Sequence, residues 1–111
     1  MAASPEQSAP ADTIPLAGLR RNILTYLYHA FRRVPDGPVE LDQICAACEV
    51  EIEALNWNIV YLEKCGYIEL GRGYPPPPYI ACWATITVQG IDLVEDSAAL
   101  HRRFPDPTEM I

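Results

Sequence analysis

Four cysteines are the residues of this sequence with the most evident chemistry. Cys45 and Cys48 stand three residues apart in an expected helix, so their thiols share one face, and four thiolates would suit zinc or an iron–sulfur cluster. Cys65 and Cys82 are separated by sixteen intervening residues, at the end of one expected helix and on an expected strand, so the fold should not gather all four. Because cysteine is also a common small core residue, we predict reduced thiols with packing roles, no bound metal and no cofactor.

Histidine and glycine patterns supply no catalytic motif. His29 and His101 are isolated, without a serine or cysteine nucleophile or a third ligand at a recognisable spacing. Gly71 and Gly73 form a Gly-x-Gly that lacks the rest of a phosphate-binding loop. We therefore predict that the chain is not an enzyme.

The composition favours one acidic, folded domain. The chain has 111 residues, half of them hydrophobic and 21% charged, which is enough apolar surface for one core. Eight basic against fifteen acidic residues give a net charge of −7, the wrong sign for general contact with phosphate. Because residues 1–15 lack the features of a signal peptide and no run of 18 apolar residues occurs, we expect a soluble, cytoplasmic protein.

Apolar spacing and turn residues predict helices followed by a hairpin. Steps of three and four residues indicate helix faces, and Tyr79 begins a stretch rich in aromatic and β-branched residues that is typical of a strand. Thr87 is expected to cap the final helix. The expected elements are a flexible leader (1–15), helices (16–34, 42–48 and 52–65) with a very short extended piece (39–41) before the second, two paired strands (67–70 and 79–88) around a loop (71–78), a last helix (88–103) and a tail (105–111).

The same spacing predicts which apolar side chains form the core. They lie on the inward faces of the helices and strands. The expected core consists of Leu19, Ile23, Leu27, Ile44, Cys48, Ile52, Leu55, Ile59, Leu62, Ile68, Ile86, Ile91 and Val94.

Three stretches of the sequence resemble winged helix-turn-helix proteins. Residues 41–50 are similar to the second helix and turn of that family, residues 61–68 (YLEKCGYI) to the end of its third helix, and residues 86–95 (ITVQGIDLVE) to the start of its last helix. The resemblance covers about residues 16–104. It implies an α+β winged helix: a three-helix helix-turn-helix core, a two-stranded β-hairpin wing and a C-terminal helix. It also implies a DNA-binding protein that regulates transcription.

The charges of the third helix favour a second function. Glu51, Glu53 and Glu63 stand against a single base, Lys64, whereas a helix that reads DNA usually presents basic or amide side chains. Glu49 stands where the family often has glycine or a small residue. The alternative is an acidic winged-helix module that binds another protein through the outer face of this helix.

That outer face carries Trp57 and Tyr61, an i, i+4 pair. Such aromatics favour a protein interface, although the leader or the final helix could cover them within the chain, or they could stack on bases. The predicted residues for binding nucleic acid or a partner are Asn56, Trp57, Tyr61, Lys64, Arg72 and Tyr74.

The expected loop contains four consecutive prolines, Pro75 to Pro78. They match the P-x-x-P pattern of ligands that bind aromatic grooves, but a stiffened wing tip is the favoured interpretation. Arg72 is the only base in this wing, which makes it a poor probe of the minor groove.

The last helix predicts a homodimer. Its apolar residues span more than the one face that its own domain can cover, and the pair Arg102 and Arg103 could meet the acids of an antiparallel partner helix. The expected interface residues are Leu93, Leu100 and Phe104. No membrane contact is expected.

Overall fold

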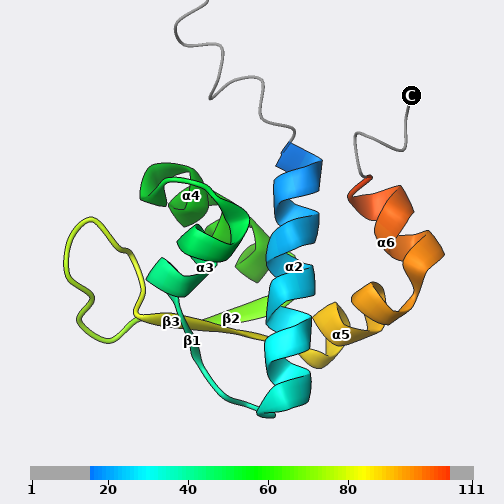
Figure 1. Ribbon diagram of the computed structural model, residues 1–111, viewed down its shortest axis with the longest axis horizontal. Helices are drawn as coiled ribbons and strands as arrows, with labels where there is room; N and C mark the ends of the chain where they lie inside the picture. Colours follow the sequence, from blue (N-terminus) through cyan, green and yellow to red (C-terminus); the bar gives the residue numbers. More distant parts are fainter. Residues whose placement is uncertain (1–15, 106–111) are drawn as a thin grey trace, which may run out of the picture.

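The computed structural model of the chain describes residues 16–105, which form five helices and one three-stranded antiparallel sheet (Figure 1). The fold is therefore α+β. Its elements, in chain order, are α2 (Leu16–Arg33), β1 (Val39–Glu40), α3 (Leu41–Cys48), α4 (Ile52–Lys64), β2 (Ile68–Gly71), β3 (Trp83–Ile86), α5 (Val88–Glu95) and α6 (Ser97–Arg103). The predicted leader (1–15) and all of the predicted tail except Pro105 lie outside the described residues. Within the described part, no helix is long and apolar enough to cross a membrane.

The sheet has the strand order β1-β3-β2. The predicted antiparallel pair is confirmed, with Ile68 opposite Ile86, but the second strand spans only Trp83–Ile86, because residues 79–82 belong to the loop and α5 begins at Val88. The short extended piece expected at residues 39–41 is present as β1, but the implied two-stranded sheet is wrong, because β1 pairs with β3, with Val39 opposite Ala84. A two-residue strand carries no periodicity, so its pairing could not be read from the spacing of apolar residues.

Helix α2 is the central element of the fold. It packs against α3 and α4, against β3 and against α5. In Figure 1 it runs between α3 and α4 on one side and α5 and α6 on the other, while the loop between β2 and β3 extends away beyond α3 and α4. Helix α2 thus contacts both the helices that precede the hairpin and the helix that follows it.

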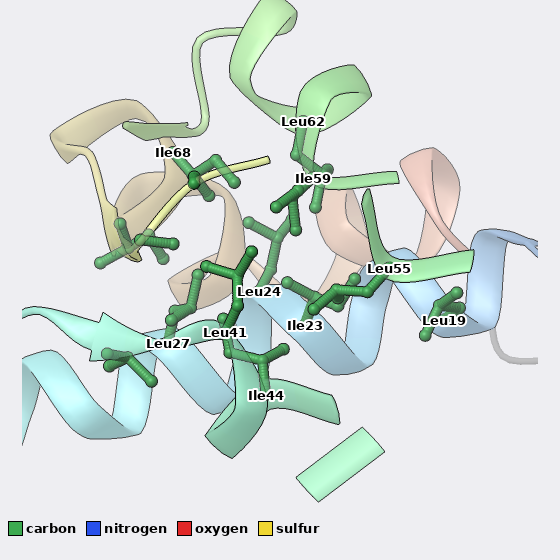
Figure 2. Close-up of a cluster of buried hydrophobic side chains, with 14 of the residues drawn as sticks. Leu19, Ile23, Leu24, Leu27, Leu41, Ile44, Leu55, Ile59, Leu62 and Ile68 are labelled. Atoms are coloured by element: carbon green, nitrogen blue, oxygen red, sulfur yellow. The ribbon is translucent and has the colours of Figure 1, made fainter. Parts of the chain in front are cut away.

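The core lies between α2, α3, α4 and the sheet (Figure 2). Nine of the thirteen predicted core residues are buried, whereas Cys48, Ile52, Ile91 and Val94 are only partly buried. Three of these four lie on α3 and α5, which are each eight residues long. Such short helices cover the core with one short face. Buried hydrophobic residues that the prediction lacked are Leu24, Val39, Leu41, Ala81, Ala84, Leu100 and Phe104.

The final helix is not continuous, which corrects the prediction of one helix over residues 88–103. Asp96 has an extended conformation, and its side chain accepts a hydrogen bond from the Ala99 N–H at 3.1 Å. Asp96 therefore ends α5 and caps the start of α6. The break allows α6 to turn so that Leu100 and Phe104 reach the core.

The turn after α3 uses a residue that is unusual in its position. Glu49 has φ 57° and ψ 49°, the left-handed conformation, and its backbone N–H donates to the Cys45 carbonyl oxygen. Glycine adopts this conformation without penalty, whereas a residue with a side chain does not. The sequence departs from the resembled family at a position where the backbone itself favours glycine.

Candidate functional site

The outer face of α4 presents one large aromatic side chain to solvent. Trp57 is 50% exposed, while Leu55, Ile59 and Leu62 of the same helix are buried. The apolar spacing of α4 turns these three residues inward, so Trp57 points away from the core. Its outward direction is as the sequence predicted.

Tyr61 is partly covered by two arginines from other helices. The Arg20 guanidinium carbon of α2 lies 3.6 Å from the centroid of the Tyr61 ring, within the range of a cation–π contact. From the other end of the chain, Arg103 Nη2 of α6 donates to the Tyr61 hydroxyl at 2.8 Å, and this hydrogen bond raises the pKa of Arg103. Of the alternatives for this face, intrachain cover therefore applies to Tyr61, with α6 contributing part of it.

A buried asparagine, which the sequence analysis missed, fixes the position of Arg20. Asn58 is fully buried, and its Oδ1 accepts from Arg20 Nε at 2.8 Å, while its Nδ2 donates to the Ala54 carbonyl oxygen at 2.7 Å. Its position three residues after Leu55 and four before Leu62 places it on the inward face of α4. A polar residue among the inward apolar positions of α4 could have indicated that its side chain is buried and hydrogen-bonded.

Arg20, held in this way, also reaches Trp57. Its guanidinium carbon lies 5.5 Å from the centroid of the indole ring. Within residues 16–105, neither Arg20 nor Arg103 forms an ion pair with a carboxylate. We call this surface the Trp57 face; it consists of Trp57, Val60, Tyr61 and Lys64 of α4 with Arg20 and Arg103 beside them.

Arg72, the basic residue predicted in the wing, is paired with an acidic residue of α4. Arg72 donates from Nη1 and Nη2 to the two carboxylate oxygens of Glu63, both at 2.8 Å. These hydrogen bonds lower the pKa of Glu63 and raise that of Arg72. The pair is bidentate, so it fixes the orientation of the guanidinium and compensates its charge.

The three remaining predicted binding residues differ in their surroundings. Asn56 Nδ2 donates to the Pro78 carbonyl oxygen at 2.9 Å, which ties α4 to the loop between β2 and β3. Tyr74, near the start of that loop, is fully exposed. Lys64 is exposed in the last turn of α4. The structure therefore brings Trp57 and Tyr61 together with Arg20 and Arg103, and does not place Arg72 as a free base beside them.

The residues predicted for a dimer interface lie mostly in the chain's own core. Leu100 is 5% exposed and Phe104 1% exposed, and the Phe104 ring meets the Tyr67 ring edge-on, with centroids 6.2 Å apart. Neither side chain is exposed to a second copy, because the break at Asp96 turns α6 inward. Of the three predicted residues, Leu93 alone is only partly buried.

All four cysteines are free and partly buried. Burial raises the pKa of Cys45 and, most strongly, that of Cys48 to about 11, with the charge of Asp42 adding to the effect on Cys45. Both thiols therefore favour the protonated form at neutral pH. Within the described part of the chain, no three histidine, cysteine, aspartate or glutamate side chains are grouped so that they could hold a metal ion.

Comparisons with known proteins assign no family. No family model matches the chain, and neither a curated protein nor a solved structure matches it.

Proposed function

We propose that this chain is a winged-helix domain that binds another protein through the Trp57 face. The order of the elements, with a strand between the first two helices and an antiparallel pair after the third, supports the winged-helix part of the proposal. The three-stranded sheet extends the two-stranded wing that the resemblance implied.

One observation carries the binding part: the half-exposed Trp57 lies beside an arginine that the fold holds in place. Trp, Tyr and Arg are the residue types most enriched among those that dominate the energy of protein interfaces. Here Arg20 contacts both rings, and the buried amide of Asn58 fixes its guanidinium. Because the fold already orders these side chains, they would lose little further conformational entropy when a partner binds.

The charges around α4 favour a protein over a polyanion. Glu51 and Glu53 are exposed at the start of α4, which is the end of a recognition helix that contacts base edges in helix-turn-helix proteins. Carboxylates there would repel phosphates. Arg72 is bonded to Glu63, and the whole chain has a net charge of −7.

A DNA-binding regulator remains the second candidate, and one specific observation favours it. Arg20 and Arg103 both contact Tyr61, and basic groups combined with an aromatic ring can bind single-stranded nucleic acid by stacking and charge. The two candidates differ in their dependence on salt, because binding to phosphates releases counterions.

Site-specific photocrosslinking tests the proposed function. A photoreactive phenylalanine analogue at position 57 is compared with the same analogue at position 88, since Val88 is also exposed and apolar but lies on α5. We expect a defined protein adduct at position 57 alone. With that partner purified, Trp57→Ala should raise Kd by about 30-fold, and Val88→Ala should leave it unchanged.

Two results would overturn the proposal. One is equal adduct formation at both positions, which would indicate non-specific contact. The other is an unchanged Kd for Trp57→Ala with the purified partner, since the main apolar anchor would then contribute nothing.

A further inference from the structure

A cavity of about 380 Å³ borders the core, between the start of α3 and the end of the loop that leads into β3. Its walls combine two aromatic rings, two carboxylates and small apolar groups. The lining residues are Glu40, Leu41, Asp42, Pro76, Tyr79, Ala81, Cys82 and Trp83.

The sheet places an indole and a carboxylate next to each other at this cavity. Glu40 of β1 is the cross-strand partner of Trp83 of β3, so the two side chains stand on the same face of neighbouring strands. On its other side Trp83 is opposite Gly71, where a Cβ would overlap the indole. The ring therefore leans over a position without a side chain and is still 44% exposed.

The two carboxylates of the cavity have no basic partner within the chain. Glu40 and Asp42 are both exposed, two residues apart, and neither forms an ion pair in the part of the chain that the structure describes. The charge of Asp42 contributes to the raised pKa of Cys45, second to burial. The mouth of the cavity is thus locally negative.

The terminal segments cannot supply a basic side chain. All eight lysines and arginines of the sequence fall within residues 16–105, and none of them lines the cavity. Residues 1–15 and 106–111 contain neither lysine nor arginine. No lysine or arginine of residues 1–111 is therefore placed to occupy the cavity.

We propose that this cavity binds an arginine side chain of a partner polypeptide, with the guanidinium stacked on Trp83 and bonded to the carboxylates of Glu40 and Asp42. A guanidinium is flat, stacks on aromatic rings and donates to carboxylates in pairs, whereas an ammonium is a compact, strongly hydrated charge. Tyr79 and Pro76 supply apolar walls for the methylene groups. This site is distinct from the Trp57 face and does not rest on it.

The two tryptophans of the chain make the test direct. Trp57→Phe leaves Trp83 as the only indole, so its fluorescence reports on the cavity alone and does not involve the Trp57 face. The probe is the capped peptide acetyl-Gly-Arg-Gly-amide, and the matched control replaces arginine by citrulline, which has the same shape without the charge. We expect a saturable fluorescence change with the arginine peptide and at least a tenfold weaker response to citrulline, since each tenfold reflects about 1.4 kcal/mol.

Variants locate the effect. Glu40→Gln with Asp42→Asn, in the Trp57→Phe background, should weaken binding at least tenfold, while Glu69→Gln, an exposed acid of β2 outside the cavity, should not. An unchanged thermal midpoint shows that the double variant is folded.

Any of four results overturns the proposal: no response to the arginine peptide, equal binding of citrulline, tighter binding of the corresponding lysine peptide, or equal weakening by Glu69→Gln. Light scattering adds a fifth. If the wild-type chain is a dimer that Glu40→Gln with Asp42→Asn dissociates, the arginine belongs to a second copy and not to a foreign partner.

Discussion

The hydroxyl of Thr87 donates to the Gly66 carbonyl oxygen at 2.6 Å. The Thr87 hydroxyl oxygen also accepts from the Gly90 N–H at 3.1 Å, and the Thr87 N–H donates to the Tyr67 carbonyl oxygen at 2.9 Å. One side chain thus joins the end of α4 to the start of α5. Two of the three stretches that resemble winged helices meet at this point of the fold.

Thr87→Val should lower the free energy of unfolding by about 1–2 kcal/mol. The substitution keeps the shape of the side chain but removes the cap of α5 and the hydrogen bond to Gly66. Urea denaturation measures the change. Thr87→Ser should retain most of the stability, and Thr85→Val, on β3 with no hydroxyl hydrogen bond in the described structure, should change it little. Equal losses at positions 85 and 87 would contradict the assigned role.

Glu49→Gly should stabilise the protein, by at most about 1 kcal/mol. Glycine relieves the left-handed backbone at φ 57°, and the greater freedom of glycine in the unfolded chain offsets part of the gain. Glu49→Ala keeps the backbone strain and should give no such gain. A shift of the urea midpoint to higher concentration for glycine alone is the expected result, and equal midpoints for both variants would count against the strain.

Leu100→Glu should unfold the chain and not merely dissociate a dimer. Leu100 lies in the core, and burying a carboxylate there costs several kcal/mol, which is comparable to the whole stability of a small domain. Leu93→Glu, at a half-buried position on α5, should cost less and leave a folded chain. Circular dichroism with light scattering separates the outcomes; a folded Leu100→Glu monomer would restore this residue to an interface.

Stability should fall between about pH 9 and pH 11 because of Cys48. Its pKa is raised by burial from 9.0 to about 11, so the folded state favours the thiol. A group with a raised folded pKa stabilises fully below its unfolded pKa and loses this contribution as pH rises through the folded value. Urea denaturation from pH 8 to 11 should show a steeper loss for wild type than for Cys48→Ala. Parallel curves would mean that Cys48 titrates normally.

The sequence was most informative where one periodicity governs a long element. In α2 and α4 the spacing of Ile23, Leu27 and Ile59 identified the buried faces, and therefore also the outward direction of Trp57. It indicated a short extended piece at Val39 but failed to predict its pairing with β3, because a two-residue strand has no period. It also failed at Asp96, where a capping side chain interrupts an apolar pattern that would otherwise continue.

The composition of the Trp57 face depends on contacts between distant segments. Arg20 and Tyr61 are brought together by the packing of α2 on α4, and Arg103 by the turn at Asp96. No local pattern contains this information. The sequence therefore predicted that Tyr61 lies on the outer side of α4. It did not predict which other segments of the chain would contact Tyr61.

The most direct test of whether α4 and the wing bind a protein or DNA is a titration at low salt. A fluorescently labelled random DNA duplex is titrated with the protein, and binding is followed by fluorescence anisotropy. We predict no saturable binding by the wild-type chain. Glu63→Gln should add weak, salt-sensitive binding, because it releases Arg72 from its bidentate partner. Saturable binding by wild type at low salt, with log K falling linearly with log salt and weakened by Lys64→Ala and Trp57→Ala, would contradict the proposed function and support a DNA-binding regulator.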